Sequence, residues 1–115
     1  MYRADFAEYN GKIPFLEFLR SLSDDEQAEI LAAIDKLLEL KNSNNRISEK
    51  LSKYIHDGFF ELRVRHQNKI SRSIFFYFKE KRIIFTNGFI KKSEKTPNSE
   101  IIKAIKIREN FIPKL

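Results

Sequence analysis

The 115-residue sequence contains no cysteine and no tryptophan, and it has only two histidines, three glycines and three prolines. Without cysteine the chain can form neither a disulfide nor a thiolate metal site. The two histidines, His56 and His66, do not stand at a spacing used by paired metal ligands. We therefore expect a protein that works without a metal ion or other cofactor.

Long apolar stretches are also missing. No apolar run approaches the roughly 20 residues that a membrane-spanning helix needs. The first residues, Met1 to Asp5, include an acid and lack the continuous apolar segment of a secretory signal. The expectation is a cytoplasmic protein with no membrane contact, folded as one domain over residues 1–115.

The net charge of +6 is distributed unevenly along the chain. Residues 1–50 hold 7 Lys and Arg against 10 Asp and Glu, whereas residues 51–115 hold 15 against 6. A basic half of this kind favours contact with a polyanion such as a nucleic acid. Solubilising surface charge is the alternative, and composition does not separate the two.

The first half of the chain predicts one strand and two helices. Residues 2–9 alternate as a strand and end in an Asn-Gly turn. Apolar residues at helical spacing predict helices over 14–22 and from Ser23 to about Lys41, the second opened by a capping box of Ser23 and Glu26. The two helices are expected to form a helical hairpin.

The second half predicts three strands and a last helix. Alternating apolar residues predict strands over 60–65, 70–78 and 83–89, joined by short polar turns as an antiparallel meander. Thr96 as N-cap and Pro97 at the first helical position start the final helix. The predicted fold class is α+β: a small antiparallel sheet with an N-terminal helical hairpin and a C-terminal helix, the helices packed on one face.

Arginines gather on the predicted strands. Arg63 and Arg65 share a strand face with Glu61. Arg72 has the parity of the apolar residue Ile74 on the next strand, and a cation on such a face needs an anionic partner or an open cleft. The alternative for Arg72 is a rim side chain that extends to water.

A second basic group precedes the final helix. Lys91, Lys92 and Lys95 lead into a helix N-terminus, where backbone N–H groups favour phosphate. Phe89 and Tyr77 add aromatic rings, and stacking combined with cationic contacts is how single-stranded RNA is usually held. Core packing is the alternative for both rings.

The sequence has no paired catalytic carboxylates, no glycine-rich phosphate loop and no nucleophile–histidine arrangement. RNA cleavage suits a site that depends on positive charge, because the 2′-hydroxyl of the substrate attacks the adjacent phosphate. Arginine and lysine can stabilise the charge of the transition state. A lysine crowded by other cations can also act as a general base.

Several short motifs, taken in order, resemble the phage-derived branch of the RelE/HigB toxin superfamily of type II toxin–antitoxin systems. They are Gly58-Phe59-Phe60-Glu61-Leu62-Arg63, Arg72 with Phe75-Phe76-Tyr77-Phe78, Gly88-Phe89-Ile90-Lys91-Lys92, Lys95-Thr96-Pro97, and Glu100 with Ala104. The resemblance covers nearly the whole chain. It implies a RelE-like, microbial-ribonuclease-like fold and a metal-independent endoribonuclease that cleaves mRNA on the ribosome.

The resemblance also implies partners and site residues. The partners are the ribosome with its mRNA and a helix-turn-helix antitoxin, through which alone the toxin meets DNA. The family commonly has histidine where this chain has Asn87, which leaves the general acid unassigned. The predicted site comprises catalytic Arg63, Arg72, Lys91 and Lys92, and RNA-contacting Arg65, Phe89 and Lys95.

Two other classes of function are compatible with the sequence. The first is a non-catalytic module that binds RNA or the ribosome, or that serves only as the corepressor of the antitoxin. The second is a basic regulatory domain that binds DNA directly, although the chain has no recognisable helix-turn-helix spacing.

Overall fold

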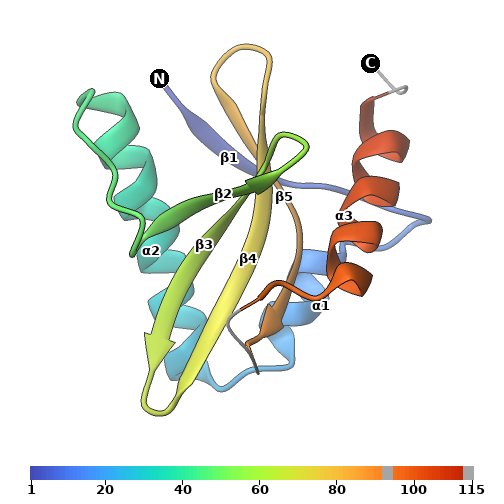
Figure 1. Ribbon diagram of the computed structural model, residues 1–115, viewed down its shortest axis with the longest axis horizontal. Coiled ribbons are helices and arrows are strands. Elements are labelled where there is room, and N and C mark those ends of the chain that lie inside the picture. The colour runs from blue at the N-terminus through green and yellow to red at the C-terminus, as the bar shows by residue number, and fades with distance from the viewer. Residues whose placement is uncertain (92–94, 113–115) are drawn as a thin grey trace.

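Within residues 1–91 and 95–112, which the computed structural model describes, five strands form one sheet and three helices cover it (Figure 1). The strands are β1 (Arg3–Phe6), β2 (Ser52–His56), β3 (Phe59–His66), β4 (Lys69–Phe78) and β5 (Arg82–Ile90). The helices are α1 (Pro14–Arg20), α2 (Asp24–Asn42) and α3 (Asn98–Phe111). The spatial order of the strands is β1-β5-β4-β3-β2.

The sheet is mixed, which corrects the prediction of a small antiparallel sheet. β3, β4 and β5 form the predicted antiparallel meander, but β1 joins β5 in parallel, with Ala4 opposite Ile83. Apolar alternation over residues 2–9 indicates a strand and its buried face, but not the direction of the neighbouring strand. The arrangement is α+β, and the RelE-like, microbial-ribonuclease-like fold expected from the sequence is wrong.

β2 is an edge strand that the sequence analysis missed. It pairs antiparallel with β3, and most of its side chains are at least partly exposed. Because neither of its faces is consistently buried, the strand lacks the apolar alternation by which a half-buried strand is recognised. Hydrogen bonding to β3, and not its own composition, makes this segment a strand.

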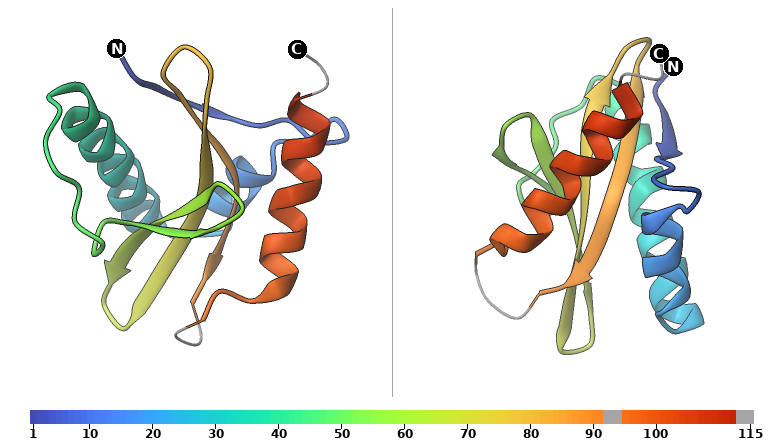
Figure 2. Two further views of the ribbon diagram at one scale, coloured as in Figure 1. Left: turned by 45° about the horizontal axis from the view of Figure 1, so that its top comes forward. Right: turned by 90° about the vertical axis from the view of Figure 1, so that its right-hand side faces the viewer.

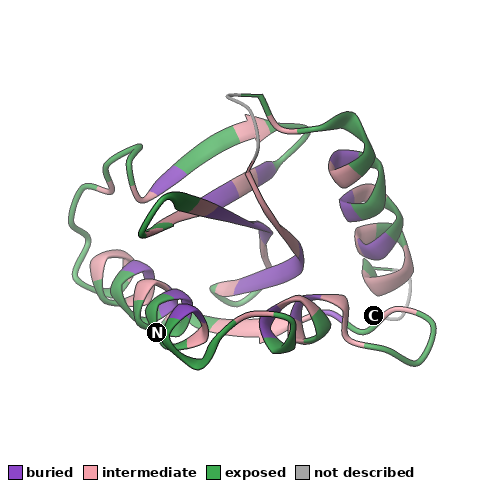
Figure 3. Cartoon of the chain, turned by 90° about the horizontal axis from the view of Figure 1, so that it is seen from below, coloured by how far each residue is buried: buried purple, intermediate pink, exposed green. Residues whose placement is uncertain are grey.

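The helices lie on both faces of the sheet, so the predicted packing on one face is also wrong (Figures 2 and 3). α1 packs against β5, and α2 packs against β3 on the same face. α3 packs on the opposite face. α1 and α2 are therefore held mainly by the sheet, and they do not form the expected hairpin of two helices packed on each other.

Each face of the sheet has its own apolar core. The core beneath α1 and α2 is formed by Phe15, Leu19, Ile30, Ile34, Leu37, Leu62, Phe75, Ile83 and Phe85. The core beneath α3 is formed by Ala7, Phe59, Ile74, Phe76, Ile84, Ala104 and Ile107. Apolar burial on both faces removes most of the central strands from water and supplies the main stabilising term of the fold.

α3 is fastened to the sheet near both ends. Toward its C-terminus, Arg108 donates to the main-chain oxygen (2.5 Å) and the carboxylate (2.9 Å) of Asp57. The same guanidinium lies 4.1 Å from the ring centroid of Phe59, within the range of a cation–π contact. In the first turn, the Asn87 amide donates to the main-chain oxygen (3.2 Å) and the carboxylate (3.0 Å) of Glu100. These contacts determine which part of the sheet α3 covers.

A β-bulge in β5 decides which side chains face α3. The pairing of β4 with β5 shifts between Ile74 and Phe75, which leaves Thr86 as the extra residue. Beyond the bulge, Asn87 pairs with Ile74 and shares its face. Phe89, two residues further on, packs against the core beneath α3. The bulge therefore turns both side chains to the α3 side of the sheet.

Gly88 lies on the opposite side of β5, where α1 approaches closely. A Cβ added at this position would be 2.3 Å from a ring carbon of Phe18. We expect Gly88→Ala to lower the free energy of unfolding by about 1–3 kcal/mol, because the phenyl ring must move out of a packed core. Urea unfolding measures the loss.

Gly11→Ala is the matched control for this substitution. Gly11 has a φ of +77° and no atom within 4 Å of an added Cβ, so alanine there adds only a backbone penalty of about 1 kcal/mol. An equal loss in the two variants would contradict the close approach of α1 at Gly88.

The N-terminus of α2 is capped as predicted. The backbone N–H and the hydroxyl of Ser23 lie 3.1 and 3.0 Å from Oε1 of Glu26, and the Glu26 backbone N–H donates to the Ser23 hydroxyl (3.2 Å). The hydrogen bonds from Ser23 lower the pKa of Glu26, since they favour its ionised form. The cap is therefore strongest while Glu26 is charged.

This cap gives a pH-dependent prediction. A carboxyl whose pKa is lowered by folding stabilises the fold above its unfolded pKa, and the contribution is lost as the pH falls through the folded pKa. Ser23→Ala is expected to cost about 1 kcal/mol at neutral pH and less below about pH 4. Urea unfolding of both proteins between neutral and acidic pH tests this, and a pH-independent difference would contradict a role for the Glu26 carboxylate.

Candidate functional site

α3 covers only one end of the sheet face on which it lies. The buried apolar residues of the second core lie beneath the helix. Toward the β3–β4 turn, the next cross-strand pairs on the same face are Arg63 with Arg72 and Arg65 with Ile70. The uncovered end of the face therefore carries three arginines on adjacent strands, in the middle of the sheet.

An open groove of about 390 Å³ lies on this uncovered end. Its lining residues are Lys50, Arg63, Arg65 and Ile70, which we call the basic groove. Among the residues that the structure describes, the lining consists of three cationic side chains and one apolar side chain, without a carboxylate. The size and the charge of the groove suit an anionic group with an apolar portion, such as a nucleotide.

Arg63 is held in the basic groove by hydrogen bonds. Its backbone N–H donates to the carbonyl of Leu51 (2.8 Å), and its Nη1 donates to the carbonyl of Glu49 (3.2 Å). Its Nε lies 3.9 Å from Oε1 of Glu61. The Arg63 side chain is 25% exposed, so a fixed guanidinium still has donors that reach a ligand.

Arg72, directly opposite Arg63 on the neighbouring strand β4, is buried. Arg72 and Glu61 are each 2% exposed, and they form an ion pair through Nη1 and Oε1. The other carboxylate oxygen, Oε2, accepts a hydrogen bond from the Thr96 hydroxyl (3.1 Å). Glu61 is thus the anionic partner expected for a cation on an apolar strand face, and the alternative of a rim side chain in water is wrong.

Two further donors of Arg72 find no hydrogen-bond partner among the described residues. Its Nε and Nη2 are buried and make no hydrogen bond within the part of the chain that the structure describes. Unpaired buried donors are costly, and in native proteins they commonly mark a functional position. Arg63, Arg72 and the single carboxylate of Glu61 near both of them together carry a net charge of +1.

The basic loop, which joins β5 to α3 and contains Lys91 and Lys95, starts beside the groove. The backbone N–H of Lys91 donates to the carbonyl of Ile70 (2.7 Å), and Lys95 is exposed just before α3. Lys92 lies outside the described residues. Thr96 does not cap α3 as predicted, because its hydroxyl bonds to Glu61 and Pro97 occupies the N-cap position without a side-chain hydrogen bond. Hydrogen bonds therefore join the loop to the sheet at Lys91, through Ile70, and at Thr96, through Glu61.

One family model matches most of the chain. The sequence model of the phage-derived Gp49-like protein family (DUF891) matches residues 17–109. The chain belongs to this family. The matched segment runs from α1 to α3 and contains every residue of the basic groove. Gp49-like proteins are associated with the toxins of toxin–antitoxin systems, which suggests an antitoxin as partner. A search of curated proteins finds no match.

In this Gp49-like chain, Asn87 has a structural role. It is 2% exposed, its Nδ2 donates twice to Glu100, and its Oδ1 accepts from the hydroxyl of Thr86 (2.6 Å). An amide does not ionise, so this side chain cannot exchange a proton with a substrate. Asn87 joins β5 to the first turn of α3 and does not replace the histidine expected at this position.

The fold brings some predicted residues together and separates others. Arg63 and Arg65 line the basic groove, and Arg72 lies opposite Arg63 on β4. Phe89 pairs with Arg72 across β4 and β5 and is half-buried against the α3 core. Tyr77 packs on the opposite face, within the core beneath α1 and α2, and so cannot stack a base at this site.

Two important residues were missed as site residues. Glu61 was noted on the arginine face, but the sequence has no signal that it is buried against Arg72. Lys50 follows a polar loop without periodicity, and the hydrogen bonds of Arg63 to the residues on either side of it bring it to the groove. Both assignments depend on contacts between distant segments.

Over 1–91 and 95–112, no group of three His, Asp or Glu side chains converges as metal ligands would. No helix within those ranges combines the length and apolarity needed to cross a bilayer.

The ion pair predicts a strong coupling between Arg72 and Glu61. Arg72→Met leaves a buried carboxylate without its main partner and is expected to cost about 3–5 kcal/mol of stability. Adding Glu61→Leu removes the stranded charge, so the double variant should recover at least half of that loss. Urea unfolding of the four proteins of this cycle measures the coupling, and additive losses would contradict it.

Proposed function

We propose that this Gp49-like chain is the toxin of a type II toxin–antitoxin pair and cleaves mRNA on the ribosome without a metal ion. The observation that carries the proposal is the basic groove, in which Arg63 is held in place at the uncovered end of the sheet. Fixed guanidinium groups bind phosphate oxygens with two donors at once. The association of the family with toxins supports the same assignment.

In the proposed reaction, the 2′-hydroxyl of the RNA attacks the adjacent phosphorus and the bond to the 5′-oxygen breaks. The products are a 2′,3′-cyclic phosphate and a 5′-hydroxyl end. The 2′-hydroxyl loses a proton to a base, and the 5′-oxygen gains one from an acid. Arg63 stabilises the additional negative charge on the phosphate, supported by Arg72 on the neighbouring strand. We assign the base to the loop of Lys91 and Lys92.

RNA binding around the reacting phosphate is assigned to neighbouring residues. Arg65 lines the basic groove, Phe89 lies beside Arg72, and Lys95 precedes α3. Arg65 and Lys95 supply charge to flanking phosphates, and Phe89 supplies a ring edge for a base. Neutralisation by the antitoxin is then proposed to use an acidic segment that covers residues 63–95, and DNA is reached only through the helix-turn-helix domain of the antitoxin.

The test is induced expression in a susceptible bacterium, with primer extension on a reporter mRNA. Arg63→Ala is expected to abolish growth arrest and to lower cleavage about 100- to 1000-fold, the usual loss when one transition-state donor is removed. Lys36→Ala is the control, because this exposed lysine lies on α2, on the other side of the sheet. Equal cleavage by wild type and Arg63→Ala would overturn the proposal.

A second function is favoured by one observation. Asn87 is buried, fully hydrogen-bonded and unable to donate a proton as an acid. This favours a non-catalytic module that binds RNA or the ribosome. The same primer extension separates the two functions, because a well-expressed module that binds without cutting leaves no ends in translated codons. Asn87→His would then be expected to introduce cleavage only if the missing acid were the sole defect.

A further inference from the structure

We propose that Lys50, Arg65 and Ile70 form a second nucleotide subsite beside Arg63, which holds the neighbouring nucleotide of a single-stranded RNA. This inference rests on the proposed function and adds a residue, Lys50, that the family resemblance does not assign. The subsite lies at the end of the basic groove toward the β3–β4 turn.

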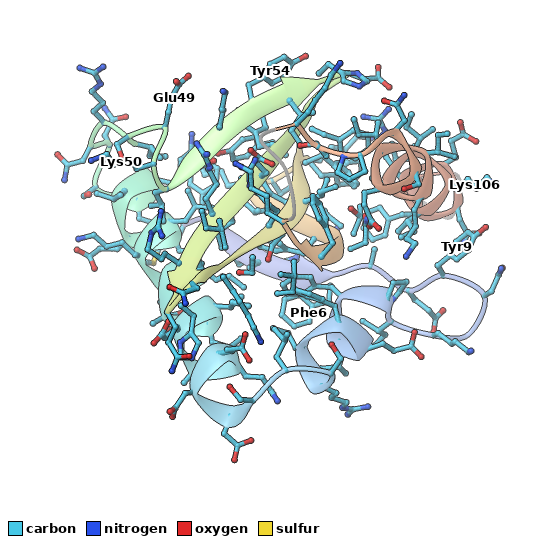
Figure 4. All side chains as sticks on the ribbon, turned by 60° about the horizontal axis from the view of Figure 1, so that its bottom comes forward. Phe6, Tyr9, Glu49, Lys50, Tyr54 and Lys106 are labelled. Atoms are coloured by element: carbon cyan, nitrogen blue, oxygen red, sulfur yellow. The ribbon has the colours of Figure 1, made fainter. Side chains whose placement is uncertain are left out.

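The position of Lys50 is determined by Arg63. The backbone N–H of Arg63 bonds to the carbonyl of Leu51, and its guanidinium bonds to the carbonyl of Glu49 (2.8 and 3.2 Å). Arg63 is thus hydrogen-bonded to the residues on both sides of Lys50. Figure 4 shows Glu49 and Lys50 on the loop that leads into β2, across the face from Lys106 on α3. The two hydrogen bonds therefore keep the backbone of Lys50 next to Arg63.

The floor of the subsite is apolar. Ile70 pairs with Arg65 across β3 and β4, and its half-buried side chain lines the β4 side of the groove, beside the cations from β3 and from the loop before β2. An aliphatic floor gives a base a surface to pack on, and the neighbouring cations on β3 and on the loop before β2 can bind the phosphates of the same strand. Cationic contacts combined with packing of a base are the general means of holding single-stranded nucleic acid.

An acidic peptide is the competing occupant of this subsite. Its carboxylates would bind the same cations, but an extended acidic segment makes no particular use of an apolar floor beside them. An apolar side chain next to a row of cations offers RNA both a surface for a base and charge for its phosphates. We therefore assign the groove to RNA and make the peptide an outcome of the test.

The experiment measures binding of a short, labelled RNA in which every 2′-hydroxyl is methylated, so that cleavage cannot occur. Fluorescence anisotropy over a series of salt concentrations gives the affinity and its salt dependence for wild type, Lys50→Ala, Lys50→Arg and Arg63→Ala. Lys36→Ala is the charge-matched control on α2. A labelled peptide of acidic residues with equal net charge is titrated in parallel.

Loss of one phosphate contact lowers the salt slope by about 0.7 and the affinity by about fivefold at 0.1 M salt. We expect this change for Lys50→Ala, near-complete restoration for Lys50→Arg, and no change beyond a small general loss for Lys36→Ala. This result would support the subsite. The effect of Lys50→Ala on RNA should also exceed its effect on the acidic peptide.

Other outcomes overturn one proposal or both. Equal RNA binding by Lys50→Ala and Lys36→Ala, with weaker binding by Arg63→Ala, would remove the subsite and leave the proposed function standing. A Lys50 effect on the peptide alone would assign the groove to an acidic partner. No RNA binding by wild type even at low salt would overturn the proposed function and the subsite together.

Discussion

Glu61 lies where three parts of the chain meet, and the candidate site depends on its buried carboxylate. One oxygen is paired with Arg72 on β4 and lies near Arg63 on β3, and the other accepts a hydrogen bond from Thr96, just before α3. A buried charge without partners would be severely destabilising, so these groups must come together when the chain folds. Glu61 therefore connects the two arginines on β3 and β4 with the segment that leads into α3.

α3 covers only part of one face of the sheet, and this leaves the basic groove open to a ligand. Asn87 and Arg108 fasten the two ends of α3 to one part of the face, and the remaining part carries cations at an open surface. A longer or shifted helix would take those cations out of water, which costs free energy unless each gains an anionic partner. The division into a covered apolar end and an open basic end thus follows from the charge of the strands.

Arg63 and Arg72, which the resemblance assigns to the same catalytic role, have different surroundings in the structure. Arg63 is partly exposed and bonded to the loop around Lys50, whereas Arg72 is buried against Glu61. The Glu61 carboxylate lowers the repulsion between these two cations on adjacent strands and leaves a net charge of +1 on the three groups. This division supports a site in which contact with phosphate and support of that contact come from separate residues.

The sequence by itself determined the local elements of this protein. The capping box at Ser23, the three strands of the meander and the basic charge of the second half follow from residues near one another in the chain. The tertiary structure decided the parallel pairing of β1, the edge strand β2, the two-sided cover of the sheet, the burial of Arg72 and the place of Lys50. These features depend on contacts between segments that are distant in the sequence. Local periodicity indicates which face of a strand or helix is buried, but it does not indicate which other segment packs on that face.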